Sequence, residues 1–213
     1  MRVAAVIPAY NEEATIADVV AAVRQAGGID PIVVVADGCT DRTAERARDA
    51  GALVVEHPEN RGKAAAMKTG ISATDSDVVV FLDADLVGLT REHVRALVAP
   101  VLAGEADMAI GLFDDGRLAT DLAQVLAPYL SGQRAVRRRL IERMFAEEPE
   151  ADVSRFGIEV ALTRFAERAG LRVKEVPLEA LTHRTKEEKL GLVKGLAARV
   201  KMYWEILKYA QKG

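Results

Sequence analysis

Short apolar runs alternate with helix-like segments over the first 112 residues, and this alternation limits the fold more than any other feature. The runs are rich in Val, Ile and Leu and occupy residues 3–7, 32–36, 53–57, 78–83 and 108–112. The segments between them repeat apolar residues at helical spacing, over residues 15–26, 40–50, 63–73 and 91–102. Strands that alternate with helices in this way form βαβ units around a mostly parallel sheet. The sequence therefore predicts an α/β fold of the doubly wound, Rossmann-like kind.

The second half of the chain changes character after a loop signal at Asp114-Asp115-Gly116. We expect helices over residues 122–129, 134–144 and 158–168, and then a strand over residues 173–178. A polar loop is expected over residues 182–189, followed by a long, basic, amphipathic helix over residues 190–212. The second half is thus expected to be mainly helical.

Composition excludes several classes of protein. The 213 residues carry a formal net charge of −3, which argues against a nucleic-acid binder, because such a domain needs a broad basic face. The single cysteine, Cys39, cannot form an internal disulfide, and no leading segment resembles a secretory signal, so the cytoplasm is the expected compartment. No apolar stretch approaches the roughly 18 residues that cross a bilayer, although contact with a membrane surface stays open.

Polar residues follow the first two predicted strands, where ligands bind in open α/β sheets. Pro8 ends the first strand, the ring of Tyr10 offers a stacking face for a base, and Glu12 can accept hydrogen bonds from a ribose or a base. Asp37 follows the second strand and can accept an N–H of a base. The alternative is that Glu12 only starts a helix, and Asp41 is better explained as a helix cap.

The third and fourth loops carry groups suited to phosphate and metal. The backbone around Gly62 opens a helix, so its N–H groups, the helix dipole and the ammonium of Lys63 together favour an anion such as a diphosphate. Asp83 and Asp85 directly follow an apolar strand and can hold a hard cation such as Mg²⁺ or Mn²⁺. The alternatives are a solvated lysine and two acids in a surface turn.

Cations gather around a Gly-containing loop in the second half. Gln133 and Arg134 stand beside Gly132 and are candidates for contact with an anionic acceptor or a donor phosphate. The arginines at residues 137–139 are better explained as a solvated helix face.

Four segments in this order, VIPAYNEEATI, ADGCTDRT, NRGKAAAMKTG and FLDADL, resemble the family 2 glycosyltransferases, which have the GT-A fold. The resemblance covers about the first 90 residues. It implies a nucleotide-sugar donor, with Lys63 close to the diphosphate or the sugar and Asp83, Ala84 and Asp85 around the ribose, diphosphate and metal. The residues it implies around the nucleoside are Pro8, Ala9, Tyr10, Glu12 and Asp37.

The pattern Phe156-Gly157-Ile158-Glu159, followed by His183-Arg184, looks like part of the glucosyl-3-phosphoglycerate synthases, a retaining family related to family 2. That resemblance implies that Glu159 contacts the donor sugar and that His183 completes the metal site. Asp85 would then supply one oxygen, the diphosphate two more, and a neutral imidazole would close the shell of Mg²⁺ or Mn²⁺. The alternative for His183 is an ordinary loop histidine.

These resemblances imply a retaining, metal-dependent hexosyltransferase that uses a nucleotide diphosphate sugar, with UDP favoured, and a small phosphorylated acceptor such as 3-phosphoglycerate. Glu159, Lys63, Gln133 and Arg134 are the catalytic candidates, and Glu159 is the candidate base if the transfer inverts. Within one domain, residues 1–112 would bind the nucleotide sugar, residues 113–189 the acceptor and metal, and residues 190–213 would form the C-terminal helix.

Two alternatives from other classes stay open. The first is a polyprenyl-phosphate glycosyltransferase, which the N-terminal motifs also resemble and whose basic final helix would lie on the membrane. The second is a nucleotide-sugar binding module without catalysis. The final helix is also suited to packing on the core or in a homodimer.

Overall fold

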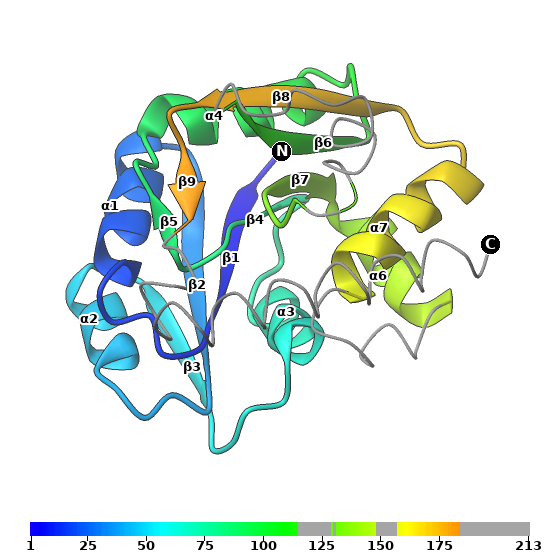
Figure 1. Ribbon diagram of the computed structural model, residues 1–213. Coiled ribbons are helices and arrows are strands. Elements are labelled where there is room, and N and C mark those ends of the chain that lie inside the picture. Colours follow the sequence, from blue (N-terminus) through cyan, green and yellow to red (C-terminus); the bar gives the residue numbers. More distant parts are fainter. Residues whose placement is uncertain (115–128, 130, 148–156, 184–213) are drawn as a thin grey trace, which may run out of the picture. The chain divides into compact units, whose positions relative to one another are not determined.

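The computed structural model describes residues 1–114, 129, 131–147 and 157–183 (Figure 1). Its main element is a seven-stranded sheet with the strand order β3-β2-β1-β4-β7-β6-β8. All neighbouring pairs are parallel except those of β7, which runs antiparallel to both β4 and β6. The strands of this sheet are β1 Val3–Ala9, β2 Ile29–Asp37, β3 Leu53–His57, β4 Val78–Phe81, β6 Met108–Asp114, β7 Arg134–Arg137 and β8 Val173–Glu179. Two short strands, β5 Leu86–Val87 and β9 Thr182–His183, form a second sheet.

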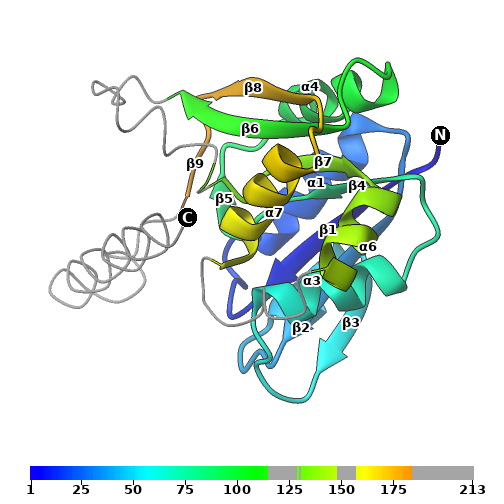
Figure 2. The ribbon, with the colours of Figure 1, turned by 90° about the vertical axis from the view of Figure 1, so that its right-hand side faces the viewer.

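Helices cover both faces of the large sheet (Figures 1 and 2). One face packs against α1, α2 and α4, and the other against α3, α6 and α7. Their bounds are α1 Ile16–Ala26, α2 Thr43–Asp49, α3 Lys63–Ser72, α4 Arg91–Leu102, α6 Arg138–Glu147 and α7 Gly157–Arg168. This three-layer arrangement confirms the predicted mostly parallel sheet flanked by helices.

The hydrophobic core consists of two clusters, one on each face of the sheet, and alternate residues of the inner strands contribute to one or the other. Ala5 and Ile7 of β1 point into the cluster with α1 and α4, whereas Val6 points into the cluster with α3, α6 and α7. Side chains on successive strand residues face opposite sides of the sheet, so both faces need apolar residues. Burial of a Val or Ile side chain contributes about 1.5–3 kcal/mol, so a continuous apolar run such as that of β1 is stabilised by an interior position in the sheet.

Most predicted elements occur within a few residues of their expected bounds, but the segment over residues 134–144 was wrongly predicted as one helix. Its first part is strand β7, and the helix begins at Arg138. Ala135 and Val136 are buried in the sheet between β4 and β6, and tertiary pairing therefore overrides the helical pattern. The prediction that residues 137–139 form a solvated helix face fails at Arg137, which lies in β7 and pairs with Asp107.

Other predictions concern the C-terminal part. Residues 1–182 cluster as one compact unit and residues 183–213 as another, of which only the backbone of His183 is described. Tyr129 apart, the helices predicted over residues 122–129 and 190–212 lie outside the described residues. The polar loop predicted over residues 182–189 is described only at Thr182–His183, where the structure has strand β9 paired with β5 instead of a loop. The single domain over residues 1–213 and its subdivision stay predictions.

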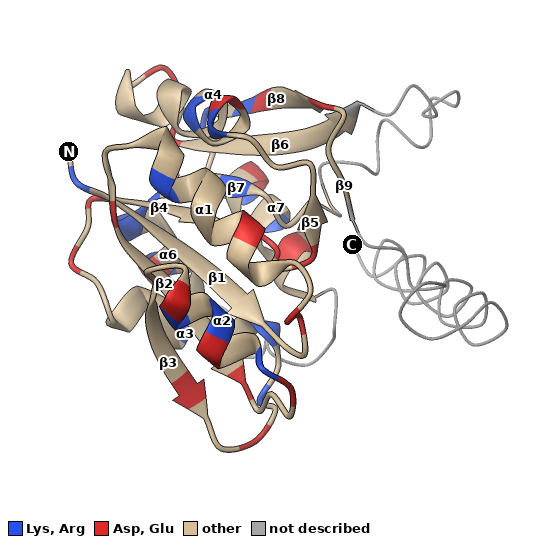
Figure 3. Ribbon diagram, turned by 90° about the vertical axis from the view of Figure 1, so that its left-hand side faces the viewer, with Lys and Arg blue, Asp and Glu red and all other residues tan. Residues whose placement is uncertain are grey.

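Charged residues are distributed over the described surface. In Figure 3, Lys and Arg are interspersed with Asp and Glu along the helices and strand ends of the face shown. Within the described part of the chain, no helix is long and apolar enough to span a bilayer.

Helix α3 approaches the sheet most closely at Gly70, and this approach generates a stability prediction. A Cβ added at Gly70 would meet Val6 Cγ1 at 2.3 Å and Val35 Cγ2 at 3.3 Å. Alanine is a better helix former than glycine by about 1 kcal/mol, but overpacking a core costs about 1–3 kcal/mol. Because a 2.3 Å approach is severe, the cost should lie in the upper part of this range, about 2–3 kcal/mol, and we expect Gly70→Ala to lower the free energy of unfolding by about 1–2 kcal/mol in urea titrations.

Ser72→Ala is the control, because Ser72 is exposed on the same helix. It should change the free energy of unfolding by less than about 0.5 kcal/mol, the usual range for surface substitutions. A Gly70→Ala protein as stable as the wild type would show that α3 can move away from the sheet without loss.

Candidate functional site

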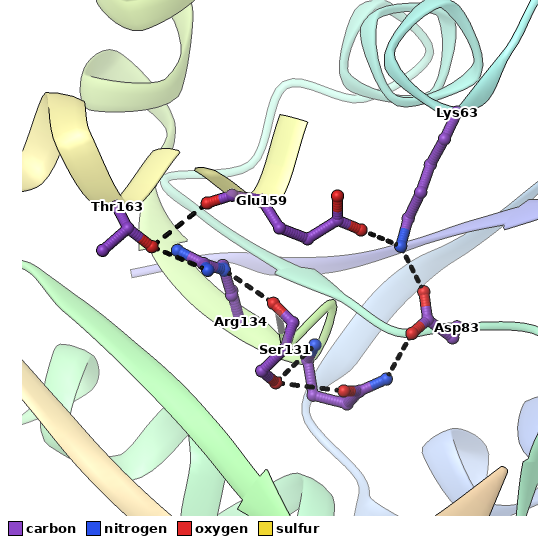
Figure 4. Close-up of polar contacts among 7 residues, drawn as sticks. Lys63, Asp83, Ser131, Arg134, Glu159 and Thr163 are labelled. Atoms are coloured by element: carbon purple, nitrogen blue, oxygen red, sulfur yellow. Dashed lines mark hydrogen bonds and ion pairs between the residues drawn. The ribbon is translucent and has the colours of Figure 1, made fainter. Parts of the chain in front are cut away.

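The predicted motifs meet where neighbouring strands end. Strands β1, β2 and β4 are adjacent and parallel, so the loops that follow Ala9, Asp37 and Phe81 leave the same edge of the sheet. The N-terminus of α3 joins them, because Lys63 contacts Asp83, and α7 contributes Glu159 (Figure 4). Five segments that are separate in sequence therefore form one site.

The loops after β1 and β2 are joined by hydrogen bonds. The Asn11 side-chain oxygen accepts from the Thr40 N–H at 2.8 Å, and the Glu12 N–H donates to the Thr43 hydroxyl at 2.8 Å. Asn11 adopts a positive φ of 55°, which asparagine tolerates better than most residues. Cys39, in the loop after β2, contacts the Asn11 N–H and the Ala9 carbonyl through its sulfur, and burial raises the pKa of its thiol. A raised pKa favours the neutral thiol, which packs as a small residue and is a poor nucleophile.

The residues predicted around a nucleoside have different environments. Tyr10 is 46% exposed, as a stacking surface requires, whereas Ala9 is buried at the end of β1. Pro8 and Glu12 are half-buried beside them. Their contact with a nucleoside stays a prediction.

Asp37 is buried, and both of its carboxylate oxygens bind other parts of the chain. Oδ1 lies 2.6 Å from His57 Nδ1 and accepts the Arg61 N–H at 3.0 Å, while Oδ2 accepts the Gly62 N–H at 2.8 Å. The backbone N–H groups predicted to bind a diphosphate therefore bind an internal carboxylate at these two positions. A carboxylate has about four lone-pair sites, and three accept these bonds, so one remains for the predicted base N–H.

Lys63 connects the two halves of the chain. Its ammonium lies 2.5 Å from Asp83 Oδ1 and 2.5 Å from Glu159 Oε1 (Figure 4). Burial alone would lower the pKa of Lys63, but the two carboxylates outweigh it and hold the pKa well above its ordinary value. Lys63 is therefore a fixed positive charge between two negative ones, rather than the solvated lysine of the alternative interpretation.

Asp83 and the loop before β7 fit closely together. Gln133 is fully buried and donates from Nε2 to Asp83 Oδ2 at 2.8 Å, and its own Oε1 accepts from the Ser131 hydroxyl. A Cβ at Gly132 would lie 2.5 Å from Asp83 Oδ2, so only glycine allows this approach. Gln133 thus orients Asp83, and its enclosure does not support direct contact with an acceptor.

Arg134 is enclosed in the same way. Only 1% of the residue is exposed, and the guanidinium donates to the Ser131 carbonyl and to the Thr163 hydroxyl, each at 2.9 Å. Burial lowers the pKa of Arg134 to about 10, against the opposing effect of Glu159 and Asp83, so the group stays charged at neutral pH. Its catalytic assignment stays a prediction, because an anion in solvent does not reach this position directly.

Glu159 is a buried carboxylate with one oxygen that lacks a hydrogen bond in the described structure. The residue is 5% exposed, Oε1 accepts from Lys63, and Oε2 has no partner. A buried acceptor without a donor is costly, and a hydroxyl group of a ligand can supply the missing bond. This geometry suits the predicted contact with a sugar.

The end of β4 also carries the predicted metal residue, Asp85. It is half-buried, and its neighbour Ala84 is fixed because the Thr15 hydroxyl donates to the Ala84 carbonyl at 2.7 Å. Within the described ranges, no group of three or more His, Cys, Asp or Glu side chains could hold a metal. Mg²⁺, however, is usually bound by one or two carboxylates together with substrate phosphates, so a single Asp85 fits. The side chain of His183 is not described, and its role as a ligand stays a prediction.

Sequence reasoning missed several residues that support the site. His57, Thr163, Ser131 and Thr15 are buried polar residues, and each has a hydrogen bond to a predicted site residue or to its backbone. Only His57 had a usable signal, because it ends the strand that follows Asp37. The pairing of Asp37 with His57 depends on strand register, which the sequence does not give.

The fold and the arrangement of the site define a GT-A glycosyltransferase domain. The profile of glycosyl transferase family 2 matches residues 4–152, and the chain belongs to this family. Among curated relatives, the glucosyl-3-phosphoglycerate synthase of Mycobacterium tuberculosis is 38% identical over 120 residues, which cover 52% of this chain and 37% of the synthase. The chain therefore matches little more than a third of that relative's length.

Two further comparisons agree with this family. A crystal structure of the M. tuberculosis synthase in complex with Mn²⁺, UDP and glucosyl-3-phosphoglycerate has a TM-score of 0.71 and 33% identity, covering 85% of this chain and 71% of the other. The undecaprenyl-phosphate 4-deoxy-4-formamido-L-arabinose transferase of Pseudomonas paraeruginosa is 33% identical over 170 residues, covering 68% of this chain and 49% of that protein.

The Lys63 network generates a second stability prediction. Lys63→Met leaves two carboxylates close together without their cation, and breaking a buried ion pair costs several kcal/mol. Because the side chains of Lys63 and Asp83 are 26% and 18% exposed, solvent reduces this cost, and we expect a loss of about 2 kcal/mol in urea unfolding. Adding Glu159→Gln to Lys63→Met should recover part of the loss, because it removes one of the opposed charges.

Lys174→Met is the matched control, since it breaks an exposed ion pair with Glu105. Such pairs contribute about 0–1 kcal/mol. Equal losses for Lys63→Met and Lys174→Met would mean that the ion pairs in the site add no more than a surface pair.

Proposed function

We propose that the protein is a metal-dependent glycosyltransferase that transfers a hexose from a UDP-sugar to a small phosphorylated acceptor, such as 3-phosphoglycerate. The observation that carries this proposal is the Lys63 ammonium held between Asp83, at the end of β4, and Glu159, in α7. In this arrangement the ammonium of Lys63 can face the diphosphate of the donor, while the carboxylate of Glu159 beside it faces the sugar. The synthase structure that resembles this chain holds Mn²⁺, UDP and the glucosylated acid together, which supports the same donor and acceptor class here.

The nucleoside end of the donor would lie on the loops after β1 and β2. The ring of Tyr10 would stack on the base, and Glu12 and Asp37 would accept hydrogen bonds from the ribose and the base, with Pro8 and Ala9 beside them. Support comes from the exposure of Tyr10 and from the hydrogen bonds that join the two loops.

A divalent cation, Mg²⁺ or Mn²⁺, would be held by Asp85, the donor diphosphate and His183. Bound there, it would stabilise the negative charge that develops on the leaving diphosphate. Ala84 and Asp83 would face the ribose and the diphosphate. The bond from Thr15 to the Ala84 carbonyl supports a fixed position for this turn.

Lys63 and Glu159 would act on the sugar end of the donor. An ammonium has three donor hydrogens, of which two point to Asp83 and Glu159, so the third is suited to a phosphate oxygen of the donor. The second oxygen of Glu159 would accept from a sugar hydroxyl and orient the hexose. Gln133 and Arg134 would act through Asp83 and α7 rather than through contact with the acceptor.

Transfer with retention of configuration needs no side-chain base, because the leaving phosphate can take the proton of the acceptor. Retention is the proposed course for this chain, since one oxygen of Glu159, the candidate base for inversion, is already bonded to Lys63.

A lipid-phosphate acceptor is the second candidate. It is favoured by the similarity to the undecaprenyl-phosphate transferase, which extends over 170 residues. The basic helix predicted over residues 190–212 would then lie on the membrane. A binding module without turnover is the third candidate.

The assay for these candidates is release of nucleoside diphosphate from UDP- and GDP-sugars with Mg²⁺ or Mn²⁺. We expect release to require 3-phosphoglycerate or a related phosphorylated acid. Stimulation only by a polyprenyl phosphate would replace the proposed acceptor with a lipid. Binding of donor without release under either condition would favour the module without catalysis.

Asp85 provides the sharpest test of the metal role. Asp85→Ala should lower metal-dependent kcat/KM by about 100-fold or more, the size of effect found when one group that stabilises developing charge is removed. Asp75→Ala is the control, because Asp75 is an exposed carboxylate that pairs with Arg2 on the surface. If both variants kept wild-type activity, Asp85 would not be a metal ligand.

A further inference from the structure

His57 forms a buried pair with Asp37, and the proposed function gives a direct contact with the donor to Asp37 but none to His57. They end adjacent strands, β3 and β2, and are register partners. His57 Nδ1 lies 2.6 Å from Asp37 Oδ1, and both side chains are almost completely enclosed, with 6% and 4% exposed. Burial of two polar side chains is costly, because each loses its hydration on folding. The pair is therefore expected to have a structural or functional role.

The imidazole is held at both of its nitrogens. A carboxylate only accepts, so Nδ1 carries the proton that it shares with Asp37. Nε2 lies 2.9 Å from the hydroxyl of Thr69, which is in α3. In the neutral ring Nε2 accepts from that hydroxyl, so the ring is fixed between β2 and α3.

Asp37, whose orientation His57 fixes, in turn binds the loop before Lys63. Its two oxygens accept the N–H groups of Arg61 and Gly62, the two residues directly before α3. The loop over residues 60–62 also packs closely against Gly38, where an added Cβ would lie 2.3 Å from the Asn60 nitrogen. The loop therefore has little freedom to move away while Asp37 keeps its position.

We propose that His57 is a positioning residue: by orienting Asp37 it holds the loop over residues 60–62, and thereby Lys63, in place for the donor. The inference rests on the proposed function, and it links the nucleoside end of the site to the diphosphate end through one carboxylate. Asp37 would accept the base N–H with its remaining lone pair while its other bonds fix the loop that presents Lys63.

Two amide substitutions separate positioning from simple packing. His57→Asn places an N–H donor close to the position of Nδ1 and keeps the bond to Asp37, whereas His57→Gln places its amide near Nε2 and keeps only the contact with Thr69. Both variants are polar and similar in size. A role in packing alone would make them equally defective, or make the larger glutamine the better substitute.

The first readout is amide hydrogen exchange by NMR without donor. We expect the Arg61 and Gly62 amides to exchange about tenfold faster in His57→Gln than in the wild type, as for a broken bond to a charged group. In His57→Asn they should stay within about threefold of the wild type, and β1 amides should not change in either variant. The second readout is the dissociation constant for UDP with Mg²⁺, which we expect to rise about tenfold in His57→Gln and to be restored in His57→Asn.

Equal exchange at Arg61 and Gly62 in the two variants would overturn the inference, and so would unchanged exchange in His57→Gln. His93→Gln, at a histidine that caps α4, is the control and should leave both amides unaffected. If the wild-type chain does not bind UDP, the proposed function fails, and the exchange comparison still decides whether His57 holds the loop.

Discussion

The site depends on one ammonium group between two carboxylates. Lys63 lies 20 residues from Asp83 and 96 residues from Glu159 in sequence, and it brings the start of α3, the end of β4 and α7 to one place. Two carboxylates this close would repel each other, so the lysine is required for the approach. Together with the buried guanidinium of Arg134, the cluster contains two positive and two negative groups. The charges of these four groups cancel, so a donor diphosphate and its divalent cation would bind next to a cluster without net charge.

A second carboxylate organises the neighbouring loop from inside. A helix N-terminus with a preceding glycine usually offers its N–H groups to an external anion. Here Asp37 accepts the N–H groups of Arg61 and Gly62, so part of this capacity stabilises the fold. The loop is thereby formed before any phosphate arrives. Preorganisation of this kind lowers the cost of binding, since less chain has to be ordered when the donor enters.

Much of the fold could be predicted from the sequence, because the apolar runs of β1, β2, β4 and β6 are buried in both core clusters and read as strands. The run of the edge strand β3 is partly exposed, but it is also rich in Leu and Val. The motifs after these strands also converge as expected, since parallel neighbours end at the same edge. Strand β7 was missed because its Arg-rich sequence suits a helix and only its partners β4 and β6 make it a strand.

The roles of buried polar residues were harder to predict than their positions. Gln133 and Arg134 were expected at a surface loop, but their side chains turn inward and bond to Asp83, Ser131 and Thr163. The pairing of His57 with Asp37 was not predicted, because strand register and not sequence spacing brings the two side chains together. Long-range hydrogen bonds of this kind follow from tertiary packing, which a local pattern does not encode.

The position of β7 limits how the molecule can be divided. Residues 134–137 fill the place between β4 and β6, so the first 112 residues alone would leave the inner edges of both strands unpaired. Exposed edges of this kind attract other chains and promote aggregation. The stretch that carries most donor motifs is consequently not an exchangeable module. A graft or truncation must retain β7, and during synthesis the central sheet closes only after the second half has emerged.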